Sequence, residues 1–320
     1  MRGVTTAPAG ATFVPMMTLK QLMATFPTNE ACKRYLQDRR WPDGVVKCPE
    51  CGNAKVYGSK ARPFTWQCTK CPAREGKKAG TPYRFSVLVG TVFENTNYPL
   101  KTWFEVLWTM LNSKKGVSAL QIQRQIGCSC YRTAWYMCHR LRAGMRDDNF
   151  RKLVGIVEMD ETYIGGKDSN RHRNKRQGHK SGGPGLFHGG KVGVIGAISR
   201  KGNVTARIIE RMDVPTAARF VRETVADAVT LVATDDCHIY DGVQWGRLRS
   251  HKSVDHSKGE YVRGEVHTAN LDAFWSLLKR GIIGNYHHVS KKYLPLYINE
   301  FTFRHNHRKD ADMFGKAVAA

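Results

Sequence analysis

Four cysteines in two close pairs constrain the fold of this 320-residue chain more than any other feature of its sequence. The pairs are Cys48-Pro-Glu-Cys51 and Cys68-Thr-Lys-Cys71, and the sixteen residues 52–67 separate them. Each pair can occupy a tight knuckle turn, and the stretch VYGSKARPFTWQ between them is typical of a short β-hairpin. The spacing therefore predicts a zinc ribbon in which Cys48, Cys51, Cys68 and Cys71 hold a structural Zn²⁺. Two structural or redox-active cysteine pairs are the alternative.

The other five cysteines are scattered along the chain, at Cys32, Cys128, Cys130, Cys138 and Cys237. Unpaired spacing of this kind suits a protein in a reducing compartment. The sequence has no run of about 18 apolar residues that could span a bilayer. Its N-terminal stretch MRGVTTAPAGATFVPMM lacks the charged and continuous apolar regions of a secretory leader. We therefore expect a cytoplasmic protein with no membrane partner.

The charge of the chain indicates a polyanionic partner. Lys and Arg outnumber Asp and Glu by 51 to 27, so the formal net charge is +24 and the isoelectric point is near 9.9. A positive balance of this size is typical of proteins that bind nucleic acid. Nucleic acid is the leading candidate.

Two stretches before residue 150 have helical periodicity. The first, residues 18–41, predicts one or two amphipathic helices broken at Pro27. The second, residues 99–146, predicts three helices, with Ser118 as N-cap of the second and Gly127 at its end.

The tight turn after Gly127 predicts a helix-turn-helix whose last helix could enter a major groove. We expect Arg132, Arg140 and Arg142 on that helix to contact DNA. A three-helix packing unit with a basic outer face would produce the same pattern.

From residue 153 the pattern becomes an α/β one, in the order β-β-β-α-β-α-β-α. The expected elements are strands at 153–165, 191–199 and 203–212, a helix at 214–229, a strand at 230–236, a helix at 238–248, a strand at 250–257 and a helix at 270–281. The Gly-rich basic stretch between Gly166 and Lys191 is expected to loop out, either as a solvated linker or as an arm that contacts DNA.

Two apolar strands carry acids. Burying a charge inside a sheet costs free energy unless a cation or hydrogen bonds compensate it, so these acids need an explanation. Asp160 lies among apolar residues, with Glu158 on the same face and Glu161 on the other, and the strand at 230–236 ends in Asp235 and Asp236. If the first and fourth strands are neighbours, as in a ribonuclease-H-like sheet, Asp160 and Asp235 converge. Gathered carboxylates repel one another, and divalent Mg²⁺ or Mn²⁺ is the usual resolution. An ordinary loop acid at 235 or 236 is the alternative.

The last helix adds an acid and a cation on one face. Asp272 and Lys279 are seven residues apart, which is about two helical turns. Asp272 can therefore approach the other acids while Lys279 binds a phosphate. Asn270 competes for the role of Asp272 but is half a turn out of phase with Lys279. Asp272 could also be a simple N-terminal charge favoured by the helix dipole.

At these residues the chain resembles the DDE transposases of bacterial insertion sequences, in the branch with an N-terminal zinc ribbon and an ISXO-like catalytic domain. The resemblance covers about Thr18 to Arg308. It rests on CPECG, CTKC, GTVFENTNYPLKTWF, KKGVSALQIQRQIG, RTAWYMCHRLR, VEMDETYIGGK, TDDCHIYDG, VHTANLDAFWSLLKRGIIGNYHHVSKKYL and INEFTFRHNHR.

The resemblance implies a ribonuclease-H-like core in which Asp160, Asp235 and the acid at 272 bind catalytic Mg²⁺ or Mn²⁺. It also implies that the protein cleaves an element's end and joins the freed 3′ hydroxyl to double-stranded target DNA. Lys279 and Arg280 would hold phosphates, while the ribbon and the helix-turn-helix read the terminal inverted repeats. Bringing two ends together implies a homo-oligomer in the DNA complex.

One departure from the branch concerns the third acid. The branch has His-Thr-Asn, two residues, then Glu, whereas this chain reads His267-Thr268-Ala269-Asn270-Leu271-Asp272. Asp272 is one methylene shorter, and some branch members use Asn, so Asn270 stays an alternative ligand. A nuclease that never joins DNA and a non-catalytic DNA-binding protein derived from a transposase are the competing functions.

The predicted organisation has five segments. They are an N-terminal arm with helices at 1–45, the zinc ribbon at 46–90, the helix-turn-helix segment at 91–150, the ribonuclease-H-like DDE domain at 151–310 and a tail at 311–320.

Overall fold

The structure is a computed structural model. It describes residues 17–72, 81–146, 150–166, 191–200, 202–235, 238–243, 245, 250–254, 260 and 262–319. The predicted arm at 1–16, the basic loop between Gly166 and Lys191, Asp236 and Cys237 lie outside these residues.

Most elements follow the order that the sequence predicts. The elements are α1 (Leu19–Thr25), α2 (Asn29–Arg40), β1 (Val56–Gly58), β2 (Thr65–Pro72), β3 (Pro82–Ser86), α3 (Leu100–Asn112), α4 (Ala119–Ile126), α5 (Tyr131–Gly144), β4 (Ile156–Ile164), β5 (Val192–Ser199), β6 (Val204–Ile209), α6 (Val214–Thr224), β7 (Leu231–Asp235), α7 (His238–Asp241), β8 (His251–Val254), α8 (Ala269–Gly281), the π-helix η5 (Ile282–Tyr286), α9 (Leu294–Asn306) and α10 (Met313–Ala319). Of these, β3, η5, α9 and α10 were not predicted, and the helices predicted at 214–229 and 238–248 end earlier, at Thr224 and Asp241. Within the described residues, no helix combines the length and the apolar character that crossing a bilayer requires.

The chain divides into two compact units, and the division falls within α3. The first unit holds residues up to Trp108 together with His307–Ala320, and the second holds Thr109–Asn306. These units group the chain differently from the five predicted segments, because the helices at 91–150 are shared between them. The predicted tail forms α10, which packs against α2.

The first unit is built around aromatic side chains and the three-stranded sheet β1-β2-β3. Phe26, Phe104 and Phe314 from three separate helical regions contact one another, with ring centroids 4.9 to 5.8 Å apart. In the sheet β1 pairs antiparallel with β2, and β2 pairs antiparallel with β3. The predicted break at Pro27 is confirmed, since it lies between α1 and α2.

In the second unit, α4 and α5 form the two helices predicted at 118–144. The Ser118 hydroxyl accepts a hydrogen bond from the Gln121 N–H at 3.1 Å and caps α4. Gly127 ends α4 at φ +66°, a left-handed conformation that glycine adopts without strain. After the short connection 127–130, α5 packs back on α4, which is compatible both with a helix-turn-helix and with the alternative helical packing unit.

A five-stranded mixed sheet forms the centre of the second unit, in the order β6-β5-β4-β7-β8. β4 pairs antiparallel with β5, β5 pairs antiparallel with β6, and β4 pairs parallel with β7. The first and fourth strands of the unit are therefore neighbours, as a ribonuclease-H-like sheet requires. β7 is apolar and buried on both faces, as expected for a central parallel strand.

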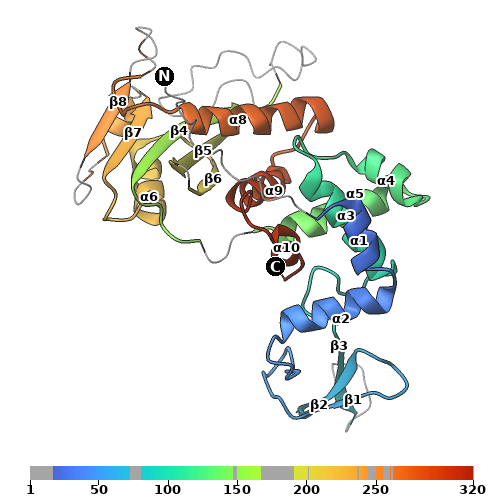
Figure 1. The fold of residues 1–320 in the computed structure, drawn as a ribbon. Helices are drawn as coiled ribbons and strands as arrows, with labels where there is room; N and C mark the ends of the chain where they lie inside the picture. The colour runs from blue at the N-terminus through green and yellow to red at the C-terminus, as the bar shows by residue number, and fades with distance from the viewer. Residues whose placement is uncertain are drawn as a thin grey trace, which may run out of the picture. The chain divides into compact units, whose positions relative to one another are not determined.

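Helices cover both faces of this sheet (Figure 1). On one face Phe220 and Val221 of α6 pack with Val157 and Met159 of β4. On the other face Phe274, Trp275 and Leu278 of α8 pack with Val194 and Ile198 of β5, together with residues of α9. Because side chains alternate along a strand, β4 directs Glu158 and Asp160 toward α8 and Met159 and Glu161 toward α6.

Candidate active site and zinc ribbon

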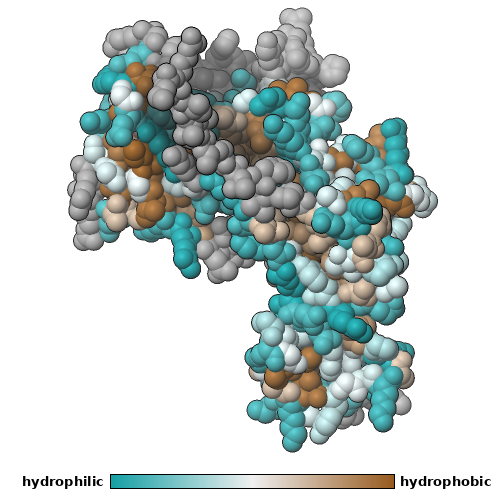
Figure 2. Space-filling view, in the orientation of Figure 1, coloured by the Kyte–Doolittle hydropathy of each residue, from teal (hydrophilic) through white to brown (hydrophobic). Residues whose placement is uncertain are grey.

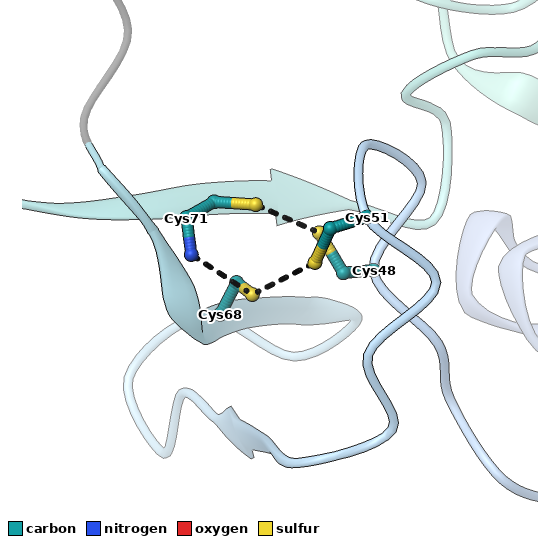
Figure 3. A group of neighbouring side chains, drawn as sticks. All are labelled: Cys48, Cys51, Cys68 and Cys71. Atoms are coloured by element: carbon teal, nitrogen blue, oxygen red, sulfur yellow. Dashed lines mark hydrogen bonds between the residues drawn. The ribbon is translucent and has the colours of Figure 1, made fainter.

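The four predicted zinc ligands come together in the first unit. Cys68 and Cys71 lie on β2, and Cys48 and Cys51 lie in the turn before β1 (Figure 3). The Sγ atoms of Cys48 and Cys71 are 3.9 Å apart, and those of Cys51 and Cys68 are 3.7 Å apart. Thiolates placed about 2.3 Å from a central Zn²⁺ in a tetrahedron are about 3.8 Å from one another. The cysteine cluster therefore fits a structural zinc ion.

Backbone amides prepare this cluster for thiolates. The N–H groups of Lys70 and Cys71 donate to the Cys68 Sγ at 3.4 and 3.5 Å. Burial raises the pKa of Cys68, but these amides and the neighbouring thiols outweigh it and lower the pKa to about 6. Cys68 thus favours the thiolate form at neutral pH, whereas burial raises the pKa of Cys48 and the hydrogen bond with Cys51 raises that of Cys71. A bound Zn²⁺ would favour the thiolate form of all four.

In the second unit Asp160 and Asp235 converge, as predicted from the order of the strands. Glu158 of β4 lies opposite Ala233 of the parallel strand β7, so the acids two residues further along each strand are side by side. Carboxylate oxygens of Asp160, Glu161 and Asp235 all lie within 4.8 Å of one another. Only oxygen donors are gathered, and such a set suits Mg²⁺ or Mn²⁺.

Crowding of like charges perturbs the central acid. Burial is the largest cause that raises the pKa of Asp160, followed by repulsion from Glu161, Asp235 and Asp272, and the pKa reaches about 8. A divalent cation between these carboxylates would remove the repulsion. The acids of β4 and β7 therefore fit a bound divalent metal.

Glu161 was not predicted to join this group, because it starts from the opposite face of β4. Its Oε2 accepts a hydrogen bond at 3.1 Å from the hydroxyl of Tyr240, which is completely buried. No local signal in the sequence pairs these residues, which are 79 positions apart. The alternation along β4 correctly predicted the face on which Glu161 starts. It could not show that the carboxylate extends to Asp160 and Asp235.

On α8 the two candidates for the third ligand lie in different surroundings. Asp272 is exposed, its Oδ2 accepts from the Thr268 hydroxyl at 3.1 Å, and its charge contributes to the raised pKa of Asp160. Asp272 does not belong to the compact group of Asp160, Glu161 and Asp235. The Asn270 amide instead donates to Glu158 Oε1 at 2.7 Å.

Trp275, whose role the sequence left ambiguous, contacts the candidate catalytic acid directly. Its indole Nε1–H donates to Asp160 Oδ2 at 3.0 Å, and its ring is 3% exposed. The ring lies over Gly196 of β5, where a Cβ atom would come within 2.5 Å of it. A glycine at 196 is what allows Trp275 to approach Asp160.

The predicted phosphate contacts Lys279 and Arg280 are both exposed near the end of α8. Lys279 lines a small pocket of about 160 Å³ together with His287, His288 and Gly165. The Arg280 Nε donates to the Ser276 carbonyl at 3.1 Å.

The three arginines predicted to contact DNA from α5 differ in exposure. Arg132 is exposed, and Arg140 is half-buried with its guanidinium over the Tyr136 ring. The prediction for Arg142 is wrong, because this side chain is 2% exposed and pairs at 2.7 Å with the completely buried Glu300. The physical reason is that α5 packs on α9 through this face, so Arg142 stabilises the core instead of meeting phosphate.

Comparisons with known proteins give both parts of the chain a family. A model described as the ISXO2-like transposase domain matches residues 152–306, and one described as the transposase zinc-ribbon domain matches residues 27–74. An uncharacterized protein in the transposable element ISH50 of Halobacterium salinarum is 28% identical over 297 residues, which are 90% of this chain and 93% of the relative.

A structural likeness was found to a chain in the cryo-EM structure of the simian T-cell lymphotropic virus intasome bound to the PP2A regulatory subunit B56 gamma. It has a TM-score of 0.30 and 13% identity, and it covers 63% of this chain and 65% of that chain. A likeness this low has no weight for the fold. The two domain matches are informative, and a transposase family implies DNA binding: the chain belongs to the ISXO2-like family of DDE transposases with an N-terminal zinc ribbon.

Proposed function

We propose that this protein binds the ends of an insertion sequence, cleaves them at their 3′ sides and joins the freed ends to target DNA. The observation that carries the proposal is the convergence of Asp160 on β4 and Asp235 on β7, beside the helix that bears Asp272 and Lys279. The family supplies the class of reaction, and the geometry supports these residues for it.

Asp160, Asp235 and Asp272 are the proposed ligands of the catalytic metal, with Glu161 beside them. Mg²⁺ or Mn²⁺ bound there would activate an attacking hydroxyl and stabilise the charge of the leaving oxygen. The raised pKa of Asp160 supports this role, because burial and neighbouring acids disfavour a negative charge there unless a cation balances it.

The chemistry consists of two phosphoryl displacements. In the first, a water oxygen bonds to phosphorus while the bond to the 3′ oxygen breaks, which frees a 3′ hydroxyl. In the second, that 3′ oxygen bonds to a phosphorus of target DNA while the target's own 3′ oxygen leaves. Lys279 and Arg280 hold the flanking phosphates in this proposal, and no covalent intermediate with the protein is needed.

DNA recognition is assigned to the zinc ribbon and to the α4–α5 pair. Arg132 and Arg140 remain the proposed contacts of α5, and both are at least partly accessible. Joining two ends of one element requires both in one complex, so we propose that two or more copies assemble on DNA. Chromosomal DNA as the substrate places the proposed activity in the cytoplasm.

The test is strand transfer in vitro, with Mg²⁺ or Mn²⁺, of a labelled oligonucleotide that carries the terminal repeat flanking the gene. The parent protein is compared with Asp272→Ala and Asn270→Ala. We expect joined product from the parent, none from Asp272→Ala, and a reduced amount from Asn270→Ala. Loss in Asn270→Ala alone would move the ligand role to the amide. Cleavage without joining would indicate a nuclease, and zinc-dependent binding without either would indicate a DNA-binding protein.

A further inference from the structure

Glu158 is a completely buried carboxylate that accepts four hydrogen bonds, and the Nδ1 atom of His267 also lies 3.3 Å from its Oε1. Its Oε2 accepts from the backbone N–H groups of Asn270 at 2.9 Å and Leu271 at 3.2 Å. Its Oε1 accepts from the Asn270 side-chain amide at 2.7 Å and from Arg200 Nε at 3.0 Å. We call Glu158, Arg200 and Asn270 the α8 clamp.

The clamp provides what the start of α8 lacks locally. A helix leaves its first N–H groups without partners, and a Ser, Thr or Asp side chain at the N-cap usually accepts from them. Here the N-cap residue Thr268 makes no capping bond, because its hydroxyl donates to Asp272. A carboxylate from a neighbouring strand therefore caps α8, and its negative charge is favourable at the positive end of the helix dipole.

Arg200 balances the buried charge and extends the clamp along the chain. Its guanidinium pairs with Glu158 Oε1 and also donates to the Glu265 carbonyl, four residues before α8 begins. An uncompensated buried carboxylate would be strongly destabilising, whereas this one is neutralised and fully hydrogen-bonded. The segment that leads into α8 is thus tied to the same side chain as the first turn of the helix.

The position of Glu158 gives the clamp a consequence for the active site. Glu158 precedes Asp160 by two residues on the same face of β4, and Asn270 precedes Asp272 by two residues on α8. A rigid connection between the two elements at this point sets the separation of Asp160 and Asp272. The shorter side chain of Asp272 makes that separation critical.

We infer that Glu158 is a positioning residue that seats the first turn of α8 on β4 and so places Asp272 for the metal held by Asp160 and Asp235. The inference rests on the proposed function, because it assigns Asp272 to the metal. It also makes Asn270 a partner of Glu158 instead of an alternative metal ligand. Asn270 holds Glu158 with both its backbone and its side-chain N–H groups, so it is a member of the clamp.

The test uses the zinc-loaded full-length protein and Mn²⁺ affinity measured by electron paramagnetic resonance. Removing a partner that orients metal ligands typically weakens metal binding by about 10- to 100-fold, and we expect a loss in this range for Glu158→Gln. Glu300→Gln is the matched control, since Glu300 is equally buried and also paired with an arginine but lies on α9. It should lower the melting temperature without changing the Mn²⁺ affinity.

Three further measurements test the inference, and the first does not depend on the folding of Glu158→Gln. Arg200→Gln leaves Glu158 in place but removes the guanidinium that pairs with it and contacts the Glu265 carbonyl; this side chain is 20% exposed, and its loss should weaken Mn²⁺ binding in the same direction. Hydrogen exchange of the metal-free protein should show faster exchange at the Asn270 and Leu271 amides in Glu158→Gln but not in Glu300→Gln. Because Glu158 and Asn270 share their contacts, the Mn²⁺ losses of Glu158→Gln and Asn270→Ala should be less than additive.

The outcomes separate this inference from the proposed function. If the parent binds Mn²⁺, Asp235→Asn abolishes that binding and Glu158→Gln leaves it unchanged, the clamp has no positioning role while the proposed metal site stands. Equal losses in Glu158→Gln and Glu300→Gln would also overturn the inference, since general destabilisation would then explain both. A parent protein that binds no Mn²⁺ would overturn the inference and the proposed function together.

Discussion

At the scale of single residues, buried acids fall into two kinds according to how their charge is balanced. Glu158 and Glu300 are completely buried, and each pairs with an arginine. Asp160 has no arginine partner among the described contacts: it accepts a hydrogen bond from the Trp275 indole, and its neighbours Glu161 and Asp235 are acids. The first kind can be explained by packing alone. The second kind is expected of a site that binds a cation.

The indole of Trp275 yields a prediction about catalysis. Trp275→Phe keeps the aromatic contact with Gly196 but removes the indole N–H that donates to Asp160 Oδ2. We expect strand transfer to fall by about 10- to 100-fold, as for other groups that orient metal ligands, with unchanged DNA affinity. Trp103→Phe is the control, because its indole also donates a hydrogen bond, to Thr96, but lies in the other compact unit. An equal loss of activity in both variants would contradict a specific role for Trp275.

At the scale of elements, the junction of α5 with α9 is a buried polar contact within the second unit. Arg142 of α5 pairs with Glu300 of α9, and its guanidinium lies 4.1 Å from the centre of the Tyr297 ring. His139, one turn earlier, stacks on Trp135, and its Nδ1 is 2.9 Å from the Trp135 carbonyl. The face of α5 that carries these residues is therefore part of the core.

His139 makes this junction sensitive to acid. Burial and then the charge of Arg142 lower the pKa of His139 from 6.5 to about 4, although Glu300 acts in the opposite direction. The unfolded chain therefore takes up a proton at this residue before the folded protein does, so stability is lost as the pH falls from about 6.5 to 4. The loss for one such group is at most about 1.4 kcal/mol per pH unit. Denaturant unfolding at several pH values should show a shallower dependence in His139→Gln, and an identical dependence in both proteins would contradict the assignment.

The zinc ribbon is the element that depends most on a metal. Its strands β1 and β3 have three and five residues, which is too little sheet to be stable by itself. Chelation of zinc should therefore abolish ordered amide signals from residues 47–72 while those of the β4–β8 sheet persist. Mass spectrometry of the native protein should give one Zn²⁺ per chain, and Cys68→Ser should reduce that number. A ribbon that stays ordered without metal would argue against structural zinc.

At the scale of the whole molecule, the net charge of +24 favours the proposed binding to DNA. Figure 2 shows hydrophilic residues over much of the visible surface of the described chain. The exposed Arg132 and the half-buried Arg140 are the α5 side chains proposed to meet phosphates.

These arginines should contribute to the salt dependence of binding. Each phosphate contact contributes about 0.9 to the slope of log affinity against log salt concentration. Arg132→Gln and Arg140→Gln should each reduce the slope by up to about that amount. Arg222→Gln, an exposed arginine on α6, serves as the control and should leave the slope unchanged. Fluorescence anisotropy across a salt series measures this slope. Unaltered slopes in both α5 variants would exclude that helix as a DNA contact.

Local signals in the sequence predicted most of the fold but only part of the site. The Ser118 cap, the Gly127 stop and the alternation of β4 act within a few residues, so their outcomes could be deduced without tertiary structure. The order of the elements then brought Asp160 and Asp235 together. Contacts between distant residues could not be deduced in this way. Trp275 reaches Asp160 across 115 positions and Arg142 reaches Glu300 across 158, and only packing decides such pairs.

The central claim is that Asp160 and Asp235 hold the metal that drives DNA joining. The most direct measurement is strand transfer of a pre-cleaved terminal-repeat oligonucleotide in Mg²⁺, by the parent and by Asp235→Asn, at protein concentrations where anisotropy shows both fully bound to the DNA. We expect joined product from the parent and none from Asp235→Asn. Equal amounts of product from the two proteins would show that the chemistry occurs elsewhere in the chain.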